Sequence, residues 1–345
     1  NNGTSVAITT SSGTGGNGDI TLVDSINQTG GGNASLTLTG RRFLRNAGAT
    51  ISLTSSGDLT FNLNAVNPEV APPSTSIQNA VDAIASVPGN RTINPGTGAY
   101  QGNNAIDINK SVTIQGQSPN TTSIRNLGTL EAIRITGGTG TNVKLINLRI
   151  ADSNNGGIYN SANLTITNSQ IQNNQAPQGG GIYNTATGNL RIINTQIQGN
   201  QSIAQGGGIF NLGTLTISNS TIANNQSASD GGGLYNAPGA GLIVSNTTFA
   251  NNRSLTDGGG IYNRGAASIA GSALEGNLAN GDGGGIYNDD GLVIQRSTLS
   301  ANIANVDNNG VGNGGGLFNE GSAFVSNSTL SGNQIRVNNG GGIYN

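Results

Sequence analysis

Three aspartates at equivalent positions of a repeat are the residues best placed to do chemistry. Asp230, Asp257 and Asp282 each stand directly before a Gly-Gly-Gly run. Coils stacked one strand spacing apart would place such carboxylates about 5 Å from one another. Like charges at that spacing repel, so the side chains must either turn into water or share a cation such as Ca²⁺, which prefers several oxygen ligands. The pattern favours solvated turn carboxylates, with a weak Ca²⁺ site as the alternative and no other cofactor.

The groups that usually carry out catalysis are scarce. The chain has no histidine and no cysteine, which removes the commonest general base and the thiolate nucleophile. The only lysines are Lys110 and Lys144, and neither stands beside a cluster of carboxylates in the sequence. We therefore expect no lyase or hydrolase activity and predict that the chain is not an enzyme.

A Gly-Gly-aliphatic-aromatic-Asn motif recurs through the last two-thirds of the chain and must position these residues. The motifs end in Asn at intervals of 24, 27, 25, 27, 25, 31 and 26 residues, which is about 26 on average. The recurring asparagines are Asn160, Asn184, Asn211, Asn236, Asn263, Asn288, Asn319 and Asn345. The aromatic position before them holds Tyr159, Tyr183, Tyr235, Tyr262, Tyr287 and Tyr344, with Phe210 and Phe318 in the remaining two copies.

Between the motifs, aliphatic residues alternate with polar ones, as in Leu164-Thr165-Ile166, which is the period of two expected of strands. Glycine runs exclude the long amphipathic helices of helical solenoids. The sequence thus predicts an all-β fold, a right-handed parallel β-helix (β-solenoid) with three strands per coil of about 26 residues and about thirteen coils in all. A short amphipathic capping helix is expected near residues 76–87, with Thr75 and Gln78 as a capping box and Pro88-Gly89 as its end.

In such a coil the motif positions become ladders along the rod. The glycines are expected at tight bends with positive φ and close backbone approach. The motif asparagines are expected to bond from coil to coil and to tolerate left-handed turns. The same is expected of a second asparagine column, which consists of Asn174, Asn200, Asn225, Asn252, Asn277, Asn302 and Asn333. Whether the tyrosine column faces inward or outward stays open at this stage.

With these residues in view, residues 154–345 resemble the GGGIYN-type right-handed β-helix repeats of bacterial autotransporter-like and polymorphic surface proteins. Residues 76–84, 92–96 and 112–116 resemble the opening of a pectin-lyase-like β-helix, in which a helix caps the first coil. Residues 1–66, in the runs 18–22 and 57–63, resemble filamentous-haemagglutinin-type exoproteins of two-partner secretion. That family's Asn-Pro-Asn-Gly turn is missing, because Asn67-Pro68 continues as Glu69-Val70, so the segment is expected downstream of any secretion domain.

These resemblances imply three parts: filamentous-haemagglutinin-like coils at 1–66, a linker at 67–75, and a pectin-lyase-like β-helix at 76–345. They imply an extracellular or outer-surface location and a structural or adhesive role. The alternative is a polysaccharide-binding, or less readily polysaccharide-cleaving, β-helix that holds a surface glycan on its tyrosines.

The bulk composition narrows the partners further. The net charge is −2 and the 14 Lys and Arg residues are scattered, which argues against nucleic acid. No stretch has the length of a membrane span. The expected partners are therefore the rest of a longer chain, a surface glycan, or further copies of the chain joined head to tail into a filament, the last because the sequence stops inside a motif copy.

Overall fold

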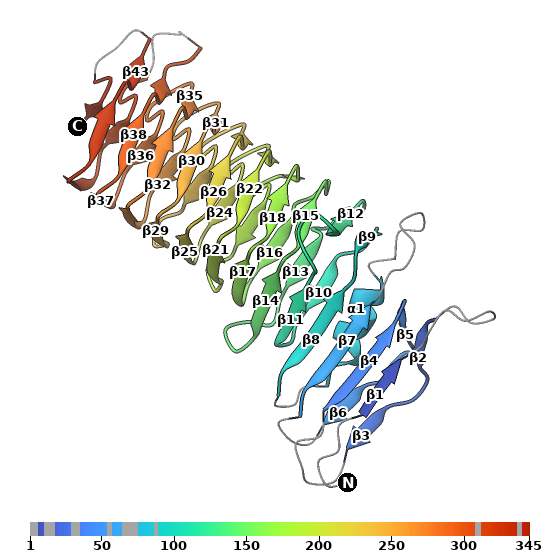
Figure 1. Cartoon of the computed structure of the whole chain (residues 1–345). Coiled ribbons are helices and arrows are strands. Elements are labelled where there is room, and N and C mark those ends of the chain that lie inside the picture. The colour runs from blue at the N-terminus through green and yellow to red at the C-terminus, as the bar shows by residue number, and fades with distance from the viewer. Residues whose placement is uncertain are drawn as a thin grey trace.

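The chain forms a rod of stacked coils (Figure 1). The structure is a computed structural model and describes residues 6–9, 18–28, 35–53, 57–63, 75–85, 89–307, 312–336 and 340–345. About twelve turns of about 25 residues follow one another along the axis. The expected linker at 67–75 lies outside the described residues, except for Thr75, which begins the helix.

The first sheet runs the whole length of the rod in thirteen parallel strands. In spatial order they are β1 (Val6–Thr9), β4 (Leu36–Gly40), β7 (Leu59–Leu63), β8 (Arg91–Pro95), β11 (Val112–Gln115), β14 (Asn142–Ile146), β17 (Asn163–Thr167), β21 (Asn189–Ile193), β25 (Thr214–Ser218), β29 (Gly241–Ser245), β33 (Ala266–Ala270), β37 (Gly291–Gln295) and β41 (Ser322–Ser326).

Two further sheets of ten strands complete the coils from residue 98 onward. The second sheet consists of β9 (Gly98–Gly102), β12 (Thr122–Asn126), β15 (Arg149–Ala151), β18 (Gln170–Gln172), β22 (Gln196–Gln198), β26 (Thr221–Ala223), β30 (Thr248–Ala250), β34 (Ala273–Glu275), β38 (Thr298–Ser300) and β42 (Thr329–Ser331). The third consists of β10 (Ile106–Ile108), β13 (Ile133–Ile135), β16 (Ile158–Asn160), β20 (Ile182–Asn184), β24 (Ile209–Asn211), β28 (Leu234–Asn236), β32 (Ile261–Asn263), β36 (Ile286–Asn288), β40 (Leu317–Asn319) and β44 (Ile343–Tyr344).

These three main parallel sheets confirm the predicted β-helix, and a fourth, short sheet adds a detail that the sequence did not indicate. Its two-residue strands lie between the second and third sheets of each repeat: β19 (Gln175–Ala176), β23 (Gln201–Ser202), β27 (Gln226–Ser227), β31 (Arg253–Ser254), β35 (Leu278–Ala279), β39 (Ile303–Ala304) and β43 (Gln334–Ile335).

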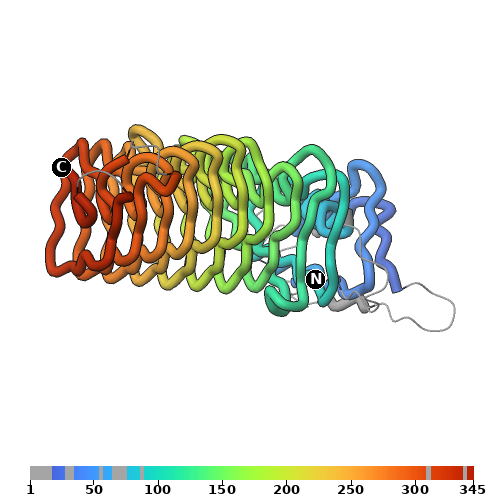
Figure 2. Tube along the Cα trace, turned by 90° about the horizontal axis from the view of Figure 1, so that it is seen from above, coloured from blue at the N-terminus to red at the C-terminus, as the bar shows by residue number. Residues whose placement is uncertain are grey.

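The coils stack one behind another along the rod (Figure 2). The core is a set of aliphatic ladders inside these coils. In one repeat the strands place Leu164, Ile166, Ile171 and Ile182 inward, each at most 1% exposed, while the residues between them face out. Parallel pairing in register sets each of these side chains on its counterpart in the next coil, as with Ile182 and Ile209. Burial of these columns is the main favourable term for folding.

The Gly-Gly-Gly runs lie where adjacent coils approach most closely. Gly231 has a φ of +67°, a conformation that disfavours larger residues. A Cβ on Gly232 would lie 2.5 Å from the carbonyl oxygen of Gly259, and one on Gly233 would lie 2.6 Å from that of Gly260, both in the next coil. The run therefore meets two separate demands, left-handed backbone at its first residue and close contact at the other two.

The helix α1 (Thr75–Ala83) lies within the rod rather than at an end of it. It packs against β5 (Phe43–Arg45) on one side and against β10 on the other (Figure 1). In its turn of the rod it takes the place of second- and third-sheet strands. In the described residues N-terminal to it, two separate two-stranded sheets accompany the first sheet, β2 (Ile20–Leu22) with β5 and β3 (Ile26–Gln28) with β6 (Ile51–Leu53).

The helix exists at the predicted place in the sequence, but it does not close an end of the rod. The first sheet passes it without a break, since β7 pairs with β8 along five residues. The helix also ends earlier than predicted, because Ile84 forms a parallel bridge to Ile51 instead of continuing the helix. No helix in the described part of the chain is long and apolar enough to cross a membrane.

Candidate functional site

The aromatic residues of the repeat line the outer face of the third sheet. In β32, Ile261 and Asn263 are fully buried, while Tyr262 between them points to the opposite face. Phe210 and Tyr235 belong to a cluster separate from the main core, together with Ala237 and Ala240. The direction that the sequence left open is therefore outward, with partial cover from neighbouring turns.

The aromatic rings stack face to face along the rod. From Tyr159 to Tyr344, neighbouring ring centroids are 4.5–5.5 Å apart and the ring planes are within 3–27° of parallel. At the N-terminal end the Arg134 guanidinium lies 4.6 Å from the centroid of Tyr159. Inside the column each ring face is thus covered by another ring, and the faces are not free to hold a sugar ring.

The three candidate aspartates stack beside the aromatic column, and each is bonded to the next coil. Asp230 Oδ1 accepts a hydrogen bond from Thr256 Oγ1 at 2.5 Å. Asp257 Oδ1 accepts from the backbone N–H of Asp282 at 2.6 Å. Asp282 Oδ1 accepts in the same way from Asn313, also at 2.6 Å. These carboxylates consequently act as links between coils.

Burial governs the electrostatics of this column. Burial raises the pKa of Asp257 to about 6, and the negative charges of Asp282, Asp230 and Glu320 add to this rise. The hydrogen bond from the Asp282 backbone N–H opposes it. Burial likewise raises the pKa of Asp282. In the described residues no three His, Cys, Asp or Glu side chains converge as they would around a metal ion. The weak Ca²⁺ site at Asp230, Asp257 and Asp282 stays a prediction.

Two tyrosine hydroxyls lie in the field of these carboxylates. The pKa of Tyr262 is raised first by burial and then by the charges of Asp230 and Asp257. The Tyr287 hydroxyl donates to Glu320 Oε2 at 2.5 Å, and burial together with this bond raises its pKa. Both phenols therefore remain protonated at neutral pH and serve as donors rather than as bases.

The motif asparagines form a continuous ladder inside the coils. Each Nδ2 donates to the Oδ1 of the next asparagine, at 2.6–2.8 Å, from Asn160 to Asn345. Their side chains are almost fully buried up to Asn319. Unbonded amides at such positions would cost free energy of folding, so the ladder satisfies groups that have no access to water.

A second ladder runs through Asn174 to Asn333 with more bonds per residue. Asn252 Nδ2 donates to Asn277 Oδ1 at 3.0 Å and to the Ile222 carbonyl at 2.9 Å. Its Oδ1 accepts from both the backbone N–H and the Nδ2 of Asn225. The left-handed residues are not these asparagines but their neighbours, such as Asn251 with a φ of +53°. The prediction that the ladder asparagines themselves adopt the left-handed conformation is therefore wrong, because the residue before them does so.

The sequence did not predict a third ladder, which is formed by hydroxyl groups. The backbone N–H of Thr195 donates to Ser220 Oγ, that of Ser220 to Thr247 Oγ1, and that of Thr247 to Ser272 Oγ, at 3.1–3.4 Å. Three of these residues directly follow an asparagine in the left-handed region, Asn194, Asn219 and Asn246. The recurring Asn-Ser or Asn-Thr pair was the signal that could have identified the ladder.

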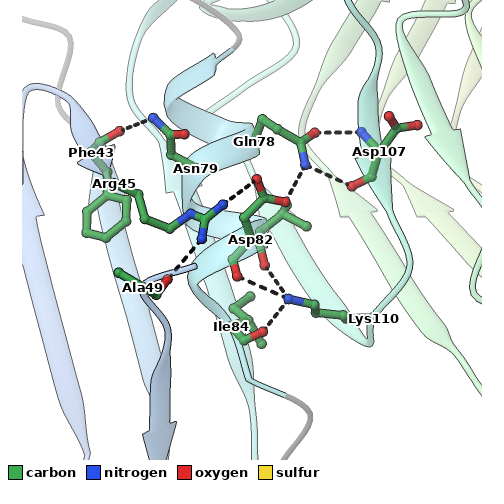
Figure 3. A network of polar contacts seen from close by, with 10 residues as sticks. Phe43, Arg45, Ala49, Gln78, Asn79, Asp82, Ile84, Asp107 and Lys110 are labelled. Atoms are coloured by element: carbon green, nitrogen blue, oxygen red, sulfur yellow. Dashed lines mark hydrogen bonds and ion pairs between the residues drawn. The ribbon is translucent and has the colours of Figure 1, made fainter. Parts of the chain in front are cut away.

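The densest polar network outside the repeat joins α1 to the coils on either side (Figure 3). The Gln78 amide forms two hydrogen bonds with the backbone of Asp107 in β10, accepting from its N–H at 2.6 Å and donating to its carbonyl at 3.2 Å. Asn79 Nδ2 donates to the Phe43 carbonyl of β5 at 3.1 Å. Side-chain amides of the helix thus satisfy strand edges that lack a neighbouring strand. The Thr75 side chain lies outside the described residues, so the capping box of Thr75 and Gln78 stays a prediction.

Lys110 holds the C-terminal end of the helix. Its Nζ donates to the carbonyls of Val81 at 3.3 Å, Asp82 at 3.2 Å and Ile84 at 2.5 Å (Figure 3). An ammonium at this end also complements the helix dipole. Burial lowers the pKa of Lys110, while the charge of Asp82, which is bonded to Arg45, opposes that shift. Lys144, by contrast, lies exposed on the outer face of β14.

Amide side chains also line a cleft of about 490 Å³ on the outside of the rod. Its lining includes Asn62, Asn94, Gln115, Gln117 and Asn147. The last two also line a neighbouring cleft of about 290 Å³. Asn94 Nδ2 donates to Asn62 Oδ1 at 2.8 Å, so the amides are ordered by one another. Such a surface offers paired donors and acceptors without charge.

The fold and its ladders define a parallel β-helix. Residues 131–279 match a family described as a right-handed beta helix region, which confirms the predicted class and handedness. No curated protein and no solved structure gave a significant match to the chain.

Proposed function

We propose that the chain is a non-enzymatic structural or adhesive segment of a secreted bacterial surface protein or extracellular fibre. One observation carries the proposal: the polar side chains that recur in every repeat are bonded to their own copies in the next coil. Asn252 is bonded to both neighbours of its ladder, and Asp257 to the backbone of Asp282. Side chains bonded in this way link the coils of the rod and are not free to act on a substrate.

The two lysines and the acidic column support the non-enzymatic part. Proton abstraction from a substrate needs a base that is free to reach the proton. Here the Lys110 ammonium is held by three carbonyl oxygens, and Lys144 stands between Thr113 and Thr165 in its outward column. A rod of this kind instead offers outer columns of side chains at regular spacing, and repetition favours multivalent contact with a surface.

Labelling of intact cells tests this assignment. An antibody against the rod should label unpermeabilised cells that produce the protein, or fibres outside them, and external protease should remove the signal. In parallel, the purified chain should not release products from pectate, alginate or glucan with or without Ca²⁺. A signal confined to permeabilised cells, or turnover that is lost in Asp257→Asn, would contradict the proposal.

A second candidate function is polysaccharide binding, and the amide-lined cleft favours it. The cleft around Asn94 and Gln115 offers uncharged donors and acceptors, which suits neutral sugar hydroxyls. The double change Gln115→Ala and Gln117→Ala should then abolish binding on a glycan array. The matched control is Gln201→Ala with Gln226→Ala, since these glutamines are exposed on the short sheet away from the cleft. Equal loss in both variants, or no glycan bound by the parent chain, contradicts this function.

A further inference from the structure

A long apolar groove lies on the outer face of the first sheet, away from the aromatic column. It has a volume of about 650 Å³ and crosses five successive strands, β25, β29, β33, β37 and β41. Ile243 and Phe324 in its wall are 55% and 58% exposed. Large apolar side chains so exposed on a common face are typical of interaction surfaces.

Two parallel columns of different size shape the groove. The strand register places one column two residues before the other on every strand. The first column is small throughout: Thr214, Gly241, Ala266, Gly291 and Ser322. The second holds Thr216, Ile243, Ser268, Val293 and Phe324. The largest residues, on β29, β37 and β41, thus each stand beside a Gly or Ser of the same strand.

The two strand glycines have no reason within the rod to be glycine. A Cβ on Gly241 would meet only Thr214 Cγ2, at 3.9 Å, and one on Gly291 would meet nothing within 4 Å. Neither glycine has a positive φ. Glycine weakens a strand, and in that setting it often marks a place where another chain approaches closely. The space above these glycines is therefore suited to an incoming side chain.

We propose that this groove binds the same groove of a second copy of the chain, so that two rods lie side by side and point the same way. A two-fold axis parallel to the rod, running between the two columns, exchanges them. Ile243 of each copy then lies over Gly241 of the other, and Val293 and Phe324 lie over Gly291 and Ser322. The occupant is a second copy because the pattern of large and small residues is complementary to itself, as an isologous interface requires.

Charge fits the same arrangement. The outward residues of these five strands are uncharged, whereas Lys144 and Arg191 stand in the larger column on the preceding coils and end the apolar strip. Asp290 directly precedes β37 and Arg296 directly follows it, both exposed. Because the two-fold axis reverses the strand direction of one copy relative to the other, it brings Asp290 of each copy towards Arg296 of its partner at both edges of the contact.

The extent of the face sets the strength of the pairing. Five strands at ~4.8 Å spacing and five residues at ~3.3 Å give roughly 400 Å² per copy, or about 800 Å² in total. Interfaces of that size are weak and transient. The pairing should therefore be concentration-dependent and reversible, and it does not depend on the adhesive or structural role proposed above.

Sedimentation velocity over a wide range of concentration tests the pairing. The parent chain should pass from monomer to dimer and stop there. The double change Gly241→Val and Gly291→Val should weaken dimerisation at least tenfold while the denaturation midpoint stays equal or rises, since valine suits an unstrained strand position. Thr165→Val, outward on the same sheet but before the strip, is the matched control and should dimerise like the parent.

A charge exchange distinguishes the two-fold pairing from non-specific association. Asp290→Arg and Arg296→Asp should each weaken dimerisation, and the two changes together should restore it. A parent chain that stays monomeric at every concentration, association that continues beyond the dimer, or glycine variants that dimerise like the parent would each overturn the proposal.

Discussion

At the scale of single residues, position in the coil decides what each side chain does. Asn252 is fully buried with its amide bonded on both sides, whereas its neighbour Asn251 is exposed and takes the left-handed turn. Asp257 and Asp289 are both aspartates, yet the first is bonded to the backbone of the next coil and the second to the exposed Arg264. Identical residue types thus serve the core, the turn or the surface.

The inward aliphatic column should carry much of the stability. Ile261→Ala removes a fully buried side chain from the ladder and should lower the free energy of unfolding by roughly 2–5 kcal/mol. Ile203→Ala, at a position 78% exposed, is the control and should change it by less than about 0.5 kcal/mol. Denaturant melts measure both. Equal effects would show that the column does not face the core.

The second asparagine ladder should be comparably important. Asn252→Ala removes hydrogen-bond partners from Asn225, Asn277 and the Ile222 carbonyl, all in a buried setting. Each buried polar group left unbonded costs about 1–3 kcal/mol. The variant should therefore lose at least ~2 kcal/mol of unfolding free energy in denaturant melts. A variant as stable as the parent would mean that water replaces the ladder without cost.

Asp257 should make stability depend on pH in an unusual direction. Its pKa of about 6 in the folded chain exceeds the ordinary value of 3.8, so the folded state binds the proton more tightly than the unfolded state. Stability contributed by this group is present below about pH 4 and is lost as the pH rises through about 6.

Asp257→Asn should therefore raise the thermal unfolding midpoint at pH 7 but not at pH 3.5, a comparison that calorimetry can make. Asparagine already stands at the equivalent position 313, so the substitution suits the site. Asp24→Asn, at an exposed position far from the column, is the control. A variant that is less stable than the parent at pH 7 would contradict the buried-carboxylate account.

At the scale of elements, the repeat was readable from the sequence and the helix only in part. Alternating aliphatics such as Leu164 and Ile166 specify a strand and its inward face, because a slip of one residue would expose the whole set. The apolar face of α1 likewise predicted a helix. Its place between coils and its end at Ala83 depend on Ile84 pairing with the distant Ile51, a contact that no local pattern reveals.

The two lysines provide a matched test of the helix. Lys110→Met removes the ammonium from three carbonyls at the C-terminal end of α1 and should cost about 1–3 kcal/mol. Lys144→Met, on an exposed outer strand face, should change the free energy of unfolding by less than about 0.5 kcal/mol. If both substitutions have the same small effect, the lysine does not hold the helix.

At the scale of the whole molecule, the fold is one-dimensional, and each coil is stabilised mainly by its neighbours. About twelve turns at ~4.8 Å each give a rod of about 60 Å. The sequence predicted this shape from the repeat length, since a coil must return to its starting position one strand spacing further on. It could not predict the direction of the tyrosines or the groove on the first sheet, because both depend on which columns adjacent coils bring together.

The central claim is that the recurrent polar residues bind their own copies rather than a substrate, and hydrogen exchange of the asparagine side-chain amides tests it most directly. Nuclear magnetic resonance should find the Nδ2 protons of Asn225, Asn236 and Asn263 protected to the same degree as the adjoining strand amides, because each donates to the next rung of a buried ladder. The exposed Asn251 is the internal reference and should exchange freely. Ladder amides that exchange as fast as that of Asn251 would contradict the account.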